Sequence, residues 1–428
     1  MAGEPTPLGA RALLRLRDFR VLWTAQLVSD IGDGLTATAL LLLVNHLTGS
    51  TAALAAMAIA LAVPPLTIGL VAGAYADRWD RRRIMLASDL LRGLLVLGFV
   101  LVDSVDRLWL LYVLAFLQSS VGTFFNPAKG AVIPRVVGAD GLLAANSLSQ
   151  ATRVIGNVVG TGVAGAMVGV VGIYWPAFAL DGASFLASFL LVSRLPAGIG
   201  RIATVDRAAA VAMGIRASLA EGLRIVGRAR ILWVTLLAMS ITMLGLGAIN
   251  VLFVPLVVNE LAASEVWFGP LEAAQTASMV LSAGAVTLIA ARLAPTRIVV
   301  VSAIGVGAVV AIAGQVTAVW QLLLALFAVG WFISPFHAAL GTILMSGAPD
   351  AGRGRVMSVL NAATSATSVL SMAAAGVVAE LVGVRGAFLV GGAICALGGG
   401  LALALYPRAT ADRREPDPLH EAVGDLAS

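Results

Sequence analysis

The chain has 428 residues, of which 59% are hydrophobic and 12% are charged, and its formal net charge is +5. A soluble domain carries about 25% charged residues, so this composition predicts a polytopic membrane protein instead of a soluble one. The positive charge does not indicate nucleic-acid binding, because the arginines fall in short segments between apolar runs and no separate basic domain exists.

A basic tail, residues 1–20, comes first, and apolar runs long enough to cross a bilayer as helices follow it. We predict an all-α membrane protein with twelve transmembrane helices in two six-helix bundles. The break between the fifth and sixth helices rests only on Gly169 and Gly172. The predicted spans are 21–44, 53–75, 84–102, 108–128, 143–168, 171–192, 231–257, 266–290, 298–317, 320–345, 355–381 and 384–406.

The distribution of basic residues fixes the predicted orientation. With both termini inside, the outer loops hold only Arg107 and Arg385, and Arg92 and Arg153 lie within spans. The other 24 of the 28 Lys and Arg residues, Lys129 included, then fall on the cytoplasmic side. We expect bundles at 21–193 and 231–407, a cytoplasmic linker at 194–230 and a disordered tail at 408–428.

The second part of the linker predicts an amphipathic helix, with Leu219, Leu223 and Val226 on its apolar face. The two halves also resemble each other. Trp109 and Trp320 begin corresponding spans, and Arg297 precedes the ninth span where an arginine cluster precedes the third. Repeated halves around a central site are typical of secondary transporters.

The sequence gives little support to ATP-driven transport, to an enzyme or to a metal-binding protein. The only lysine, Lys129, lies between Ala128 and Gly130, so the chain has no phosphate-binding loop, and we find no nucleophile elbow. One cysteine and three scattered histidines make a disulfide framework or a metal site implausible. We therefore predict no cofactor, no metal and no enzymatic activity, and transport driven by an ion gradient or by downhill flow.

A charged loop after the second span carries the most specific motif. Its residues fit the pattern Gly-x-x-x-Asp-Arg-x-Gly-Arg-Arg, with Asp80 at the second glycine, and the matching residues are Gly73, Asp77, Arg78, Arg81 and Arg82. This loop resembles the signature of the major facilitator superfamily, in its bacterial drug- and siderophore-exporter branch. Further stretches that look like that branch are 29–33, 125–128, 133–134, 145–148 and 354–358.

The resemblance implies that the loop is a cytoplasmic latch. Asp77 would meet the start of helix 11 near Arg355 when the cytoplasmic side is closed, because a helix N-terminus favours a carboxylate. The alternative, which has equal weight for Arg82 and Arg83, is that the arginines only orient the loop.

Two features depart from the drug/proton antiporter pattern. The arginine of helix 4 is absent, which leaves Gln118 and Gly122 there with no basic partner, and the Gly-Pro pair of helix 5 is missing.

Ionisable residues within spans are the candidates for proton coupling. A charge in the membrane interior costs free energy, so such residues are usually placed there for a function. Asp30 and Asp33 share a face of the first helix. Arg153 is a candidate counter-charge for an acidic residue or for an anionic group of the cargo. Alternatively, Arg153 forms a purely structural ion pair with one of these aspartates. A structural role for Asp181 has the same weight as a transport role. Asp89 and Arg92 predict a local ion pair in the third helix.

Polar and aromatic residues within the spans are candidates for a substrate cavity, although aromatic residues also line interfaces and helix contacts. These candidates are Trp23, Gln26, Phe124, Asn250, Glu272, Trp331, His337 and Asn361.

We predict a monomeric, proton-coupled exporter of an amphipathic small molecule in the inner membrane. Its partners would be the small-molecule substrate, protons and the lipid bilayer, with no nucleic acid. The alternatives are a dedicated exporter of an endogenous metabolite or siderophore and, from another class, a non-transporting membrane sensor or scaffold.

Overall fold

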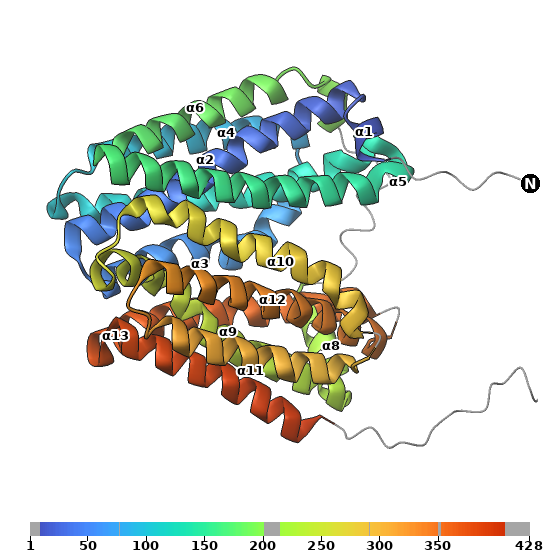
Figure 1. Cartoon of the computed structure of the whole chain (residues 1–428). Coiled ribbons are helices and arrows are strands. Elements are labelled where there is room, and N and C mark those ends of the chain that lie inside the picture. The colour runs from blue at the N-terminus through green and yellow to red at the C-terminus, as the bar shows by residue number, and fades with distance from the viewer. Residues whose placement is uncertain (1–8, 77, 201–214, 291, 350–351, 407–428) are drawn as a thin grey trace, which may run out of the picture.

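The computed structural model describes residues 9–76, 78–200, 215–290, 292–349 and 352–406. Within these ranges the chain is helical with short connections (Figure 1). The N-terminal half contains α1 (Ala10–Leu13), α2 (Arg17–Thr48), α3 (Thr51–Ala76), α4 (Arg81–Gly98), α5 (Leu108–Val171) and α6 (Trp175–Val192). The C-terminal half contains α9 (Arg230–Pro255), α10 (Phe268–Ala290), α11 (Pro295–Ala313), α12 (Val319–Gly347) and α13 (Arg353–Leu405).

Two of these helices each contain two membrane crossings. Gly138 (φ 68°, ψ 178°) interrupts α5, and Gly383 (φ 75°, ψ 168°) interrupts α13, so each long helix folds back on itself at a glycine with a positive φ, which other residues rarely adopt. With both counted as pairs, the described helices make the predicted twelve spans. Gly172 ends α5 in the left-handed conformation typical of helix C-termini, which confirms the expected break between the fifth and sixth spans.

The connection between the fourth and fifth spans differs from the prediction. We expected the fourth span to end at residue 128, but the helix continues to the break at Gly138. Val132, Ile133 and Val137 on this extension belong to one buried apolar cluster with Leu13 of α1. This apolar contact stabilises helix where the polarity around Lys129 had indicated a loop.

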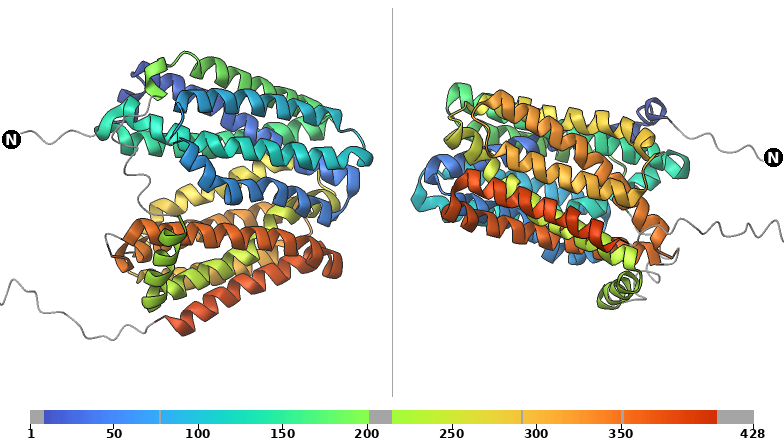
Figure 2. Two further views of the ribbon diagram at one scale, coloured as in Figure 1. Left: turned by 180° about the vertical axis from the view of Figure 1, so that it is seen from behind. Right: turned by 60° about the horizontal axis from the view of Figure 1, so that its bottom comes forward.

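The linker helix, α8 (Ile215–Arg228), lies at the inner end of the C-terminal half (Figures 1 and 2). Val226 is buried, as predicted for its apolar face, but Leu223 is 57% exposed. Gly222 is buried instead, because α8 rests closely on the start of α13 there. The side chain of Leu219 and the predicted disordered tail lie outside the described residues, and the domain limits stay a prediction.

The packing of the two halves differs between their outer and inner ends. At the outer end one apolar cluster contains residues of both halves, including Leu43 and Met57 with Val251 and Phe268. At the inner end each half has its own cluster, one around Phe19 and another that includes Phe336. Within the described residues, the halves therefore share a core only on the outer side.

Individual contacts between the halves agree with this division. Asn45 and Asn259 exchange two amide hydrogen bonds of 3.0 and 3.1 Å. The Thr51 hydroxyl donates to the carbonyl of Gly376 at 3.3 Å. All four residues lie near the outer ends of their helices, and α10 diverges from α5 toward the end where α2 begins (Figure 1). The structure thus has the outer side closed and the inner ends apart.

Candidate functional site

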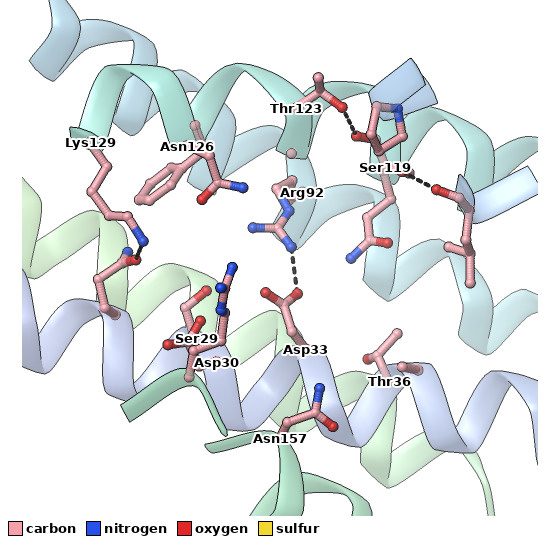
Figure 3. A pocket seen from close by; sticks show the side chains of 18 of the residues that line it. Ser29, Asp30, Asp33, Thr36, Arg92, Ser119, Thr123, Asn126, Lys129 and Asn157 are labelled. Carbon is pink, nitrogen blue, oxygen red and sulfur yellow. Dashed lines mark hydrogen bonds and ion pairs between the residues drawn. The ribbon is translucent and has the colours of Figure 1, made fainter. Parts of the chain in front are cut away.

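A cavity of about 570 Å³ lies in the N-terminal half, between α2, α3, α4 and α5. Its polar residues come from helices that are far apart in sequence (Figure 3). They are Gln26, Ser29, Asp30, Asp33, Thr36, Arg92, Gln118, Ser119, Thr123, Asn126, Lys129, Arg153 and Asn157. This concentration of charge in a helix bundle marks the cavity as the candidate site.

An ion pair joins α2 to α4 across the cavity. Nη2 of Arg92 donates to Oδ1 of Asp33 (Figure 3). The guanidinium also lies over the ring of Phe185 of α6, 4.2 Å from its centroid, where the face of the ring attracts a cation. The Arg92 side chain is 13% exposed and that of Asp33 is 38% exposed. The carboxylate is thus the more accessible member of the pair.

Two further cations line the cavity from α5. Nζ of Lys129 donates to Oε1 of Gln26 at 2.6 Å. Nη2 of Arg153 donates to Oε1 of Gln150, one turn earlier in the same helix. The structure brings Arg153 into the same cavity as Asp30 and Asp33, without a hydrogen bond between them.

Two other carboxylates of this half are fully buried outside the cavity lining. Ser184 donates to Asp181 at 3.0 Å, and Ser188 donates to Asp89 at 2.7 Å. Asp181 and Ser184 pack directly against Gly32 of α2, where a side chain would collide with them. Asp181 therefore makes a packing contact between α2 and α6, and its proposed part in coupling stays a prediction.

The structure corrects three expectations about the basic residues. Arg92 pairs with Asp33 and not with Asp89, because it extends across the bundle toward α2. Lys129, assigned to an inner loop, lines the cavity. Gly122 does have a basic neighbour: a methyl group placed there would lie 3.3 Å from Nε of Arg92. A cation from α4 thus occupies the space beside α5 where the expected arginine is missing.

The charged loop between α3 and α4 is anchored by its arginines. Arg81 is buried and donates to the carbonyl of Ala131 at 3.5 Å, and Arg82 donates to the carbonyl of Ser193 at 2.5 Å. Both contacts join the start of α4 to other helices of the N-terminal half.

The proposed latch itself is only partly visible. Gly73 lies in α3, Arg78 is exposed, and Asp77 lies outside the described residues. Asp80, at the variant position of the motif, caps α4 by accepting a hydrogen bond of 3.0 Å from the backbone of Arg83. The latch stays a prediction.

A smaller cavity of about 250 Å³ lies in the C-terminal half and is mostly apolar. Asn250, Glu272 and Gln275 are its polar residues. It brings together two of the predicted cavity residues, Asn250 and Glu272, but in the opposite half from Gln26.

The remaining predicted cavity residues lie outside the linings of these two cavities. Trp23 donates to the Thr152 hydroxyl at 2.8 Å and so joins α2 to α5. Phe124 lines a separate hollow between α4 and α5. Trp331, His337 and Asn361 are exposed on α12 and α13. Their role in binding stays a prediction.

Sequence reasoning missed Lys129, Arg92, Asn126 and Asn157 as cavity residues. Lys129 was detectable, since it is the only lysine and follows Asn126 and Pro127 directly after a predicted span. Asn157 lies one turn after Arg153, on the face of α5 that approaches α2 at Gly34.

A family model described as transmembrane secretion effector matches residues 8–423. The chain belongs to this family of major facilitator transporters. A major facilitator transporter moves a small-molecule substrate across the membrane in which its helices are embedded, and this chain is such a transporter.

Two relatives match most of the chain. The uncharacterized MFS-type transporter YfiS of Bacillus subtilis (strain 168) is 27% identical over 383 residues, which cover 87% of this chain and 89% of the relative. Multidrug efflux pump Tap of Mycolicibacterium fortuitum is 28% identical over 382 residues, or 85% of this chain and 90% of that protein. The crystal structure of the nucleoside transporter NupG shares the fold, with a TM-score of 0.73, 11% identity and coverage of 91% and 99% of the two chains.

Proposed function

We propose that this transporter is a proton-coupled exporter that moves an amphipathic small molecule out of the cell across the cytoplasmic membrane, working as a monomer. The observation that carries the proposal is the Asp33–Arg92 ion pair at the cavity between α2 and α4. Its carboxylate is accessible from the cavity, so it can exchange a proton. The similarity to a relative named multidrug efflux pump Tap supports export as the direction.

In the proposed cycle, Asp33 carries the proton. When Asp33 is ionised, its pair with Arg92 holds α2 against α4. Protonation removes one charge, and the guanidinium loses its partner in a site where an isolated cation is costly. A change of protonation therefore alters the contact between two helices that line the cavity, which couples the proton to the conformation.

Asp89 is the proposed alternative partner for Arg92. It lies one turn earlier in α4, and its Oδ1 atom is buried without a hydrogen-bond partner within the described part of the chain. Transfer of the guanidinium from Asp33 to Asp89 would pair both the released cation and this unsatisfied oxygen. The Asp89–Arg92 ion pair, which the sequence spacing predicted, would then form when Asp33 is protonated.

The halves would rock about the outer contact to expose the cavity to each side in turn. The proposed rigid units are 21–193 and 231–407, joined by the linker 194–230. On closure of the inner side, the loop with Asp77 would meet the N-terminus of α13. In the present conformation, Arg355 near that terminus donates to Glu221 of α8 at 2.5 Å.

The experiment uses inverted membrane vesicles with an acidified interior. Candidate amphipathic compounds are added outside, and a pH-sensitive dye reports proton release from the vesicles. We expect cargo-dependent release in the wild type and none in Asp33→Asn. Asp103→Asn is the matched control, because it removes a carboxylate from an exposed ion pair with Arg107 in an outer loop.

Two results would overturn the proposal. One is the absence of substrate-linked proton flux for every compound although the protein is folded in the membrane. The other is transport against a gradient at the full rate by Asp33→Asn.

A further inference from the structure

The charged residues that line the N-terminal cavity do not balance. Among the residues of the lining that the structure describes, three are cations, Arg92, Lys129 and Arg153, and two are carboxylates, Asp30 and Asp33. With all five ionised, these residues carry one excess positive charge. The other two carboxylates of this region, Asp89 and Asp181, are fully buried behind the lining and do not reach the cavity surface.

The hydrogen bonds show which cations supply the excess. Arg92 is matched by Asp33. Lys129 and Arg153 instead donate to the neutral side-chain amides of Gln26 and Gln150. Asp30 is the only other carboxylate among the described residues of the lining, so there a single carboxylate faces two cations without a direct hydrogen bond to either.

This arrangement disfavours a cationic cargo. A carrier of cations needs a carboxylate that becomes available when its proton leaves. Here the proton carrier Asp33 is already occupied by Arg92 when it is ionised, and Asp30 lies beside two cations. Loss of the proton therefore leaves no uncompensated negative charge in the cavity to attract a cation.

An anionic group would fit the same positions. A carboxylate or a phosphate accepts charge-assisted hydrogen bonds, and Arg and Lys donors can exchange the amide oxygens of glutamine for such an acceptor. The polar amides of Asn126 and Asn157 lie in the same lining and supply further donors. Leu40, Leu61 and Phe125 of the same lining offer an apolar surface for the rest of the molecule.

We propose that Lys129 and Arg153 form a subsite for an anionic group, so that the cargo is an acidic amphiphile. This inference rests on the proposed function, because it takes the cavity to be the cargo site. It names the sign of the cargo charge, which the proton coupling alone does not determine.

The test measures binding at equilibrium, without a proton gradient. Purified full-length protein in nanodiscs of phosphatidylcholine is titrated with two fluorescent probes that differ in their charged end. The probes are dansyl-aminohexanoate, which ends in a carboxylate, and dansyl-cadaverine, which ends in an amine. Fluorescence anisotropy gives the two dissociation constants after subtraction of the signal from empty nanodiscs.

We expect the anionic probe to bind the wild type about tenfold more tightly than the cationic probe. Lys129→Gln and Arg153→Gln should each weaken the anionic probe about tenfold and leave the cationic probe unchanged or tighter. Arg153→Lys keeps the charge and should retain most of the affinity. Arg107→Gln, in an outer loop, is the matched control and should bind as the wild type does.

Three results would overturn the proposed subsite. The wild type could bind the two probes equally, it could bind the cationic probe more tightly, or both Gln variants could keep the wild-type affinity for the anionic probe. The comparison of the two probes on the wild type needs no variant to fold. The proton-flux assay with Asp33→Asn can fail while the anion preference holds, and the reverse is also possible, so the two proposals are tested separately.

Discussion

The glycine contact between α5 and α10 allows a quantitative test of how the outer side closes. Gly162 of α5 and Gly269 of α10 face each other with their backbones in contact. A methyl group added at Gly269 would lie 2.7 Å from Cα of Gly162, whereas one added at Gly162 would lie 3.5 Å from Cα of Gly269. The first distance requires a shift of the helices, and the second is an ordinary van der Waals contact. Gly269→Ala and Gly162→Ala are therefore a matched pair.

The obstacle at Gly269 is backbone, which cannot rotate away. Overpacking of this kind costs about 1–3 kcal/mol. The gain in helix propensity from Gly to Ala applies to the outer-closed and outer-open states alike, so it cancels in their equilibrium. We expect Gly269→Ala to shift the equilibrium toward the outer-open state by about 5- to 150-fold, and Gly162→Ala to shift it little.

Distances between spin labels measure this shift. Val170 of α5 and Leu381 of α13 are 76% and 78% exposed at the outer ends of the two halves. Cysteines at these positions, with Cys395 replaced by alanine, carry the labels. Double electron–electron resonance should show a larger long-distance population in Gly269→Ala than in the parent. An unchanged distribution, or equal opening by Gly162→Ala, would refute the reasoning.

Three further predictions concern other contacts. Arg92→Gln leaves Asp33 without its partner and should destabilise the protein by about 1.5–3 kcal/mol in thermal unfolding, because the remaining carboxylate is still partly exposed. Asp33→Asn added to it should recover part of this loss, and strict additivity would contradict the pair. Asn45→Ala and Asn259→Ala should each widen the outer side in the same spin-label assay. The double variant should open about as far as either single variant, because each substitution removes the same two hydrogen bonds, and an additive effect would contradict the pair. Asp80→Ala removes the cap of α4 and should cost about 1 kcal/mol, seen as faster amide exchange confined to the first turn of α4, with protection elsewhere unchanged.

Much of the fold was predictable because membrane helices follow simple rules. Apolar runs of spanning length, and arginines confined to one side, predicted the number of crossings and their direction. The break at Gly172 was predictable for the same local reason, since glycine accepts the left-handed conformation at a helix end. These signals depend on neighbouring residues in the chain and need no knowledge of tertiary contacts.

The site was less predictable because it depends on how the helices are rotated. Arg92 was placed with Asp89 on the evidence of helical spacing, but its long side chain reaches Asp33 of another helix. Lys129 was assigned to the cytoplasmic face because a cation there is usual, yet it reaches Gln26 inside the bundle. Hydropathy distinguishes span from loop and does not say which face of a span lines a cavity.

Proton coupling through Asp33 is the central claim, and transport by purified protein tests it most directly. Proteoliposomes are loaded with a cargo that the vesicle screen identifies, and a pH gradient is imposed while the membrane potential is held at zero. The account predicts that the cargo moves uphill, opposite to the protons, in the wild type and only downhill in Asp33→Asn. Uphill movement in Asp33→Asn, or a wild-type rate that stays the same when the pH gradient is collapsed, would contradict it.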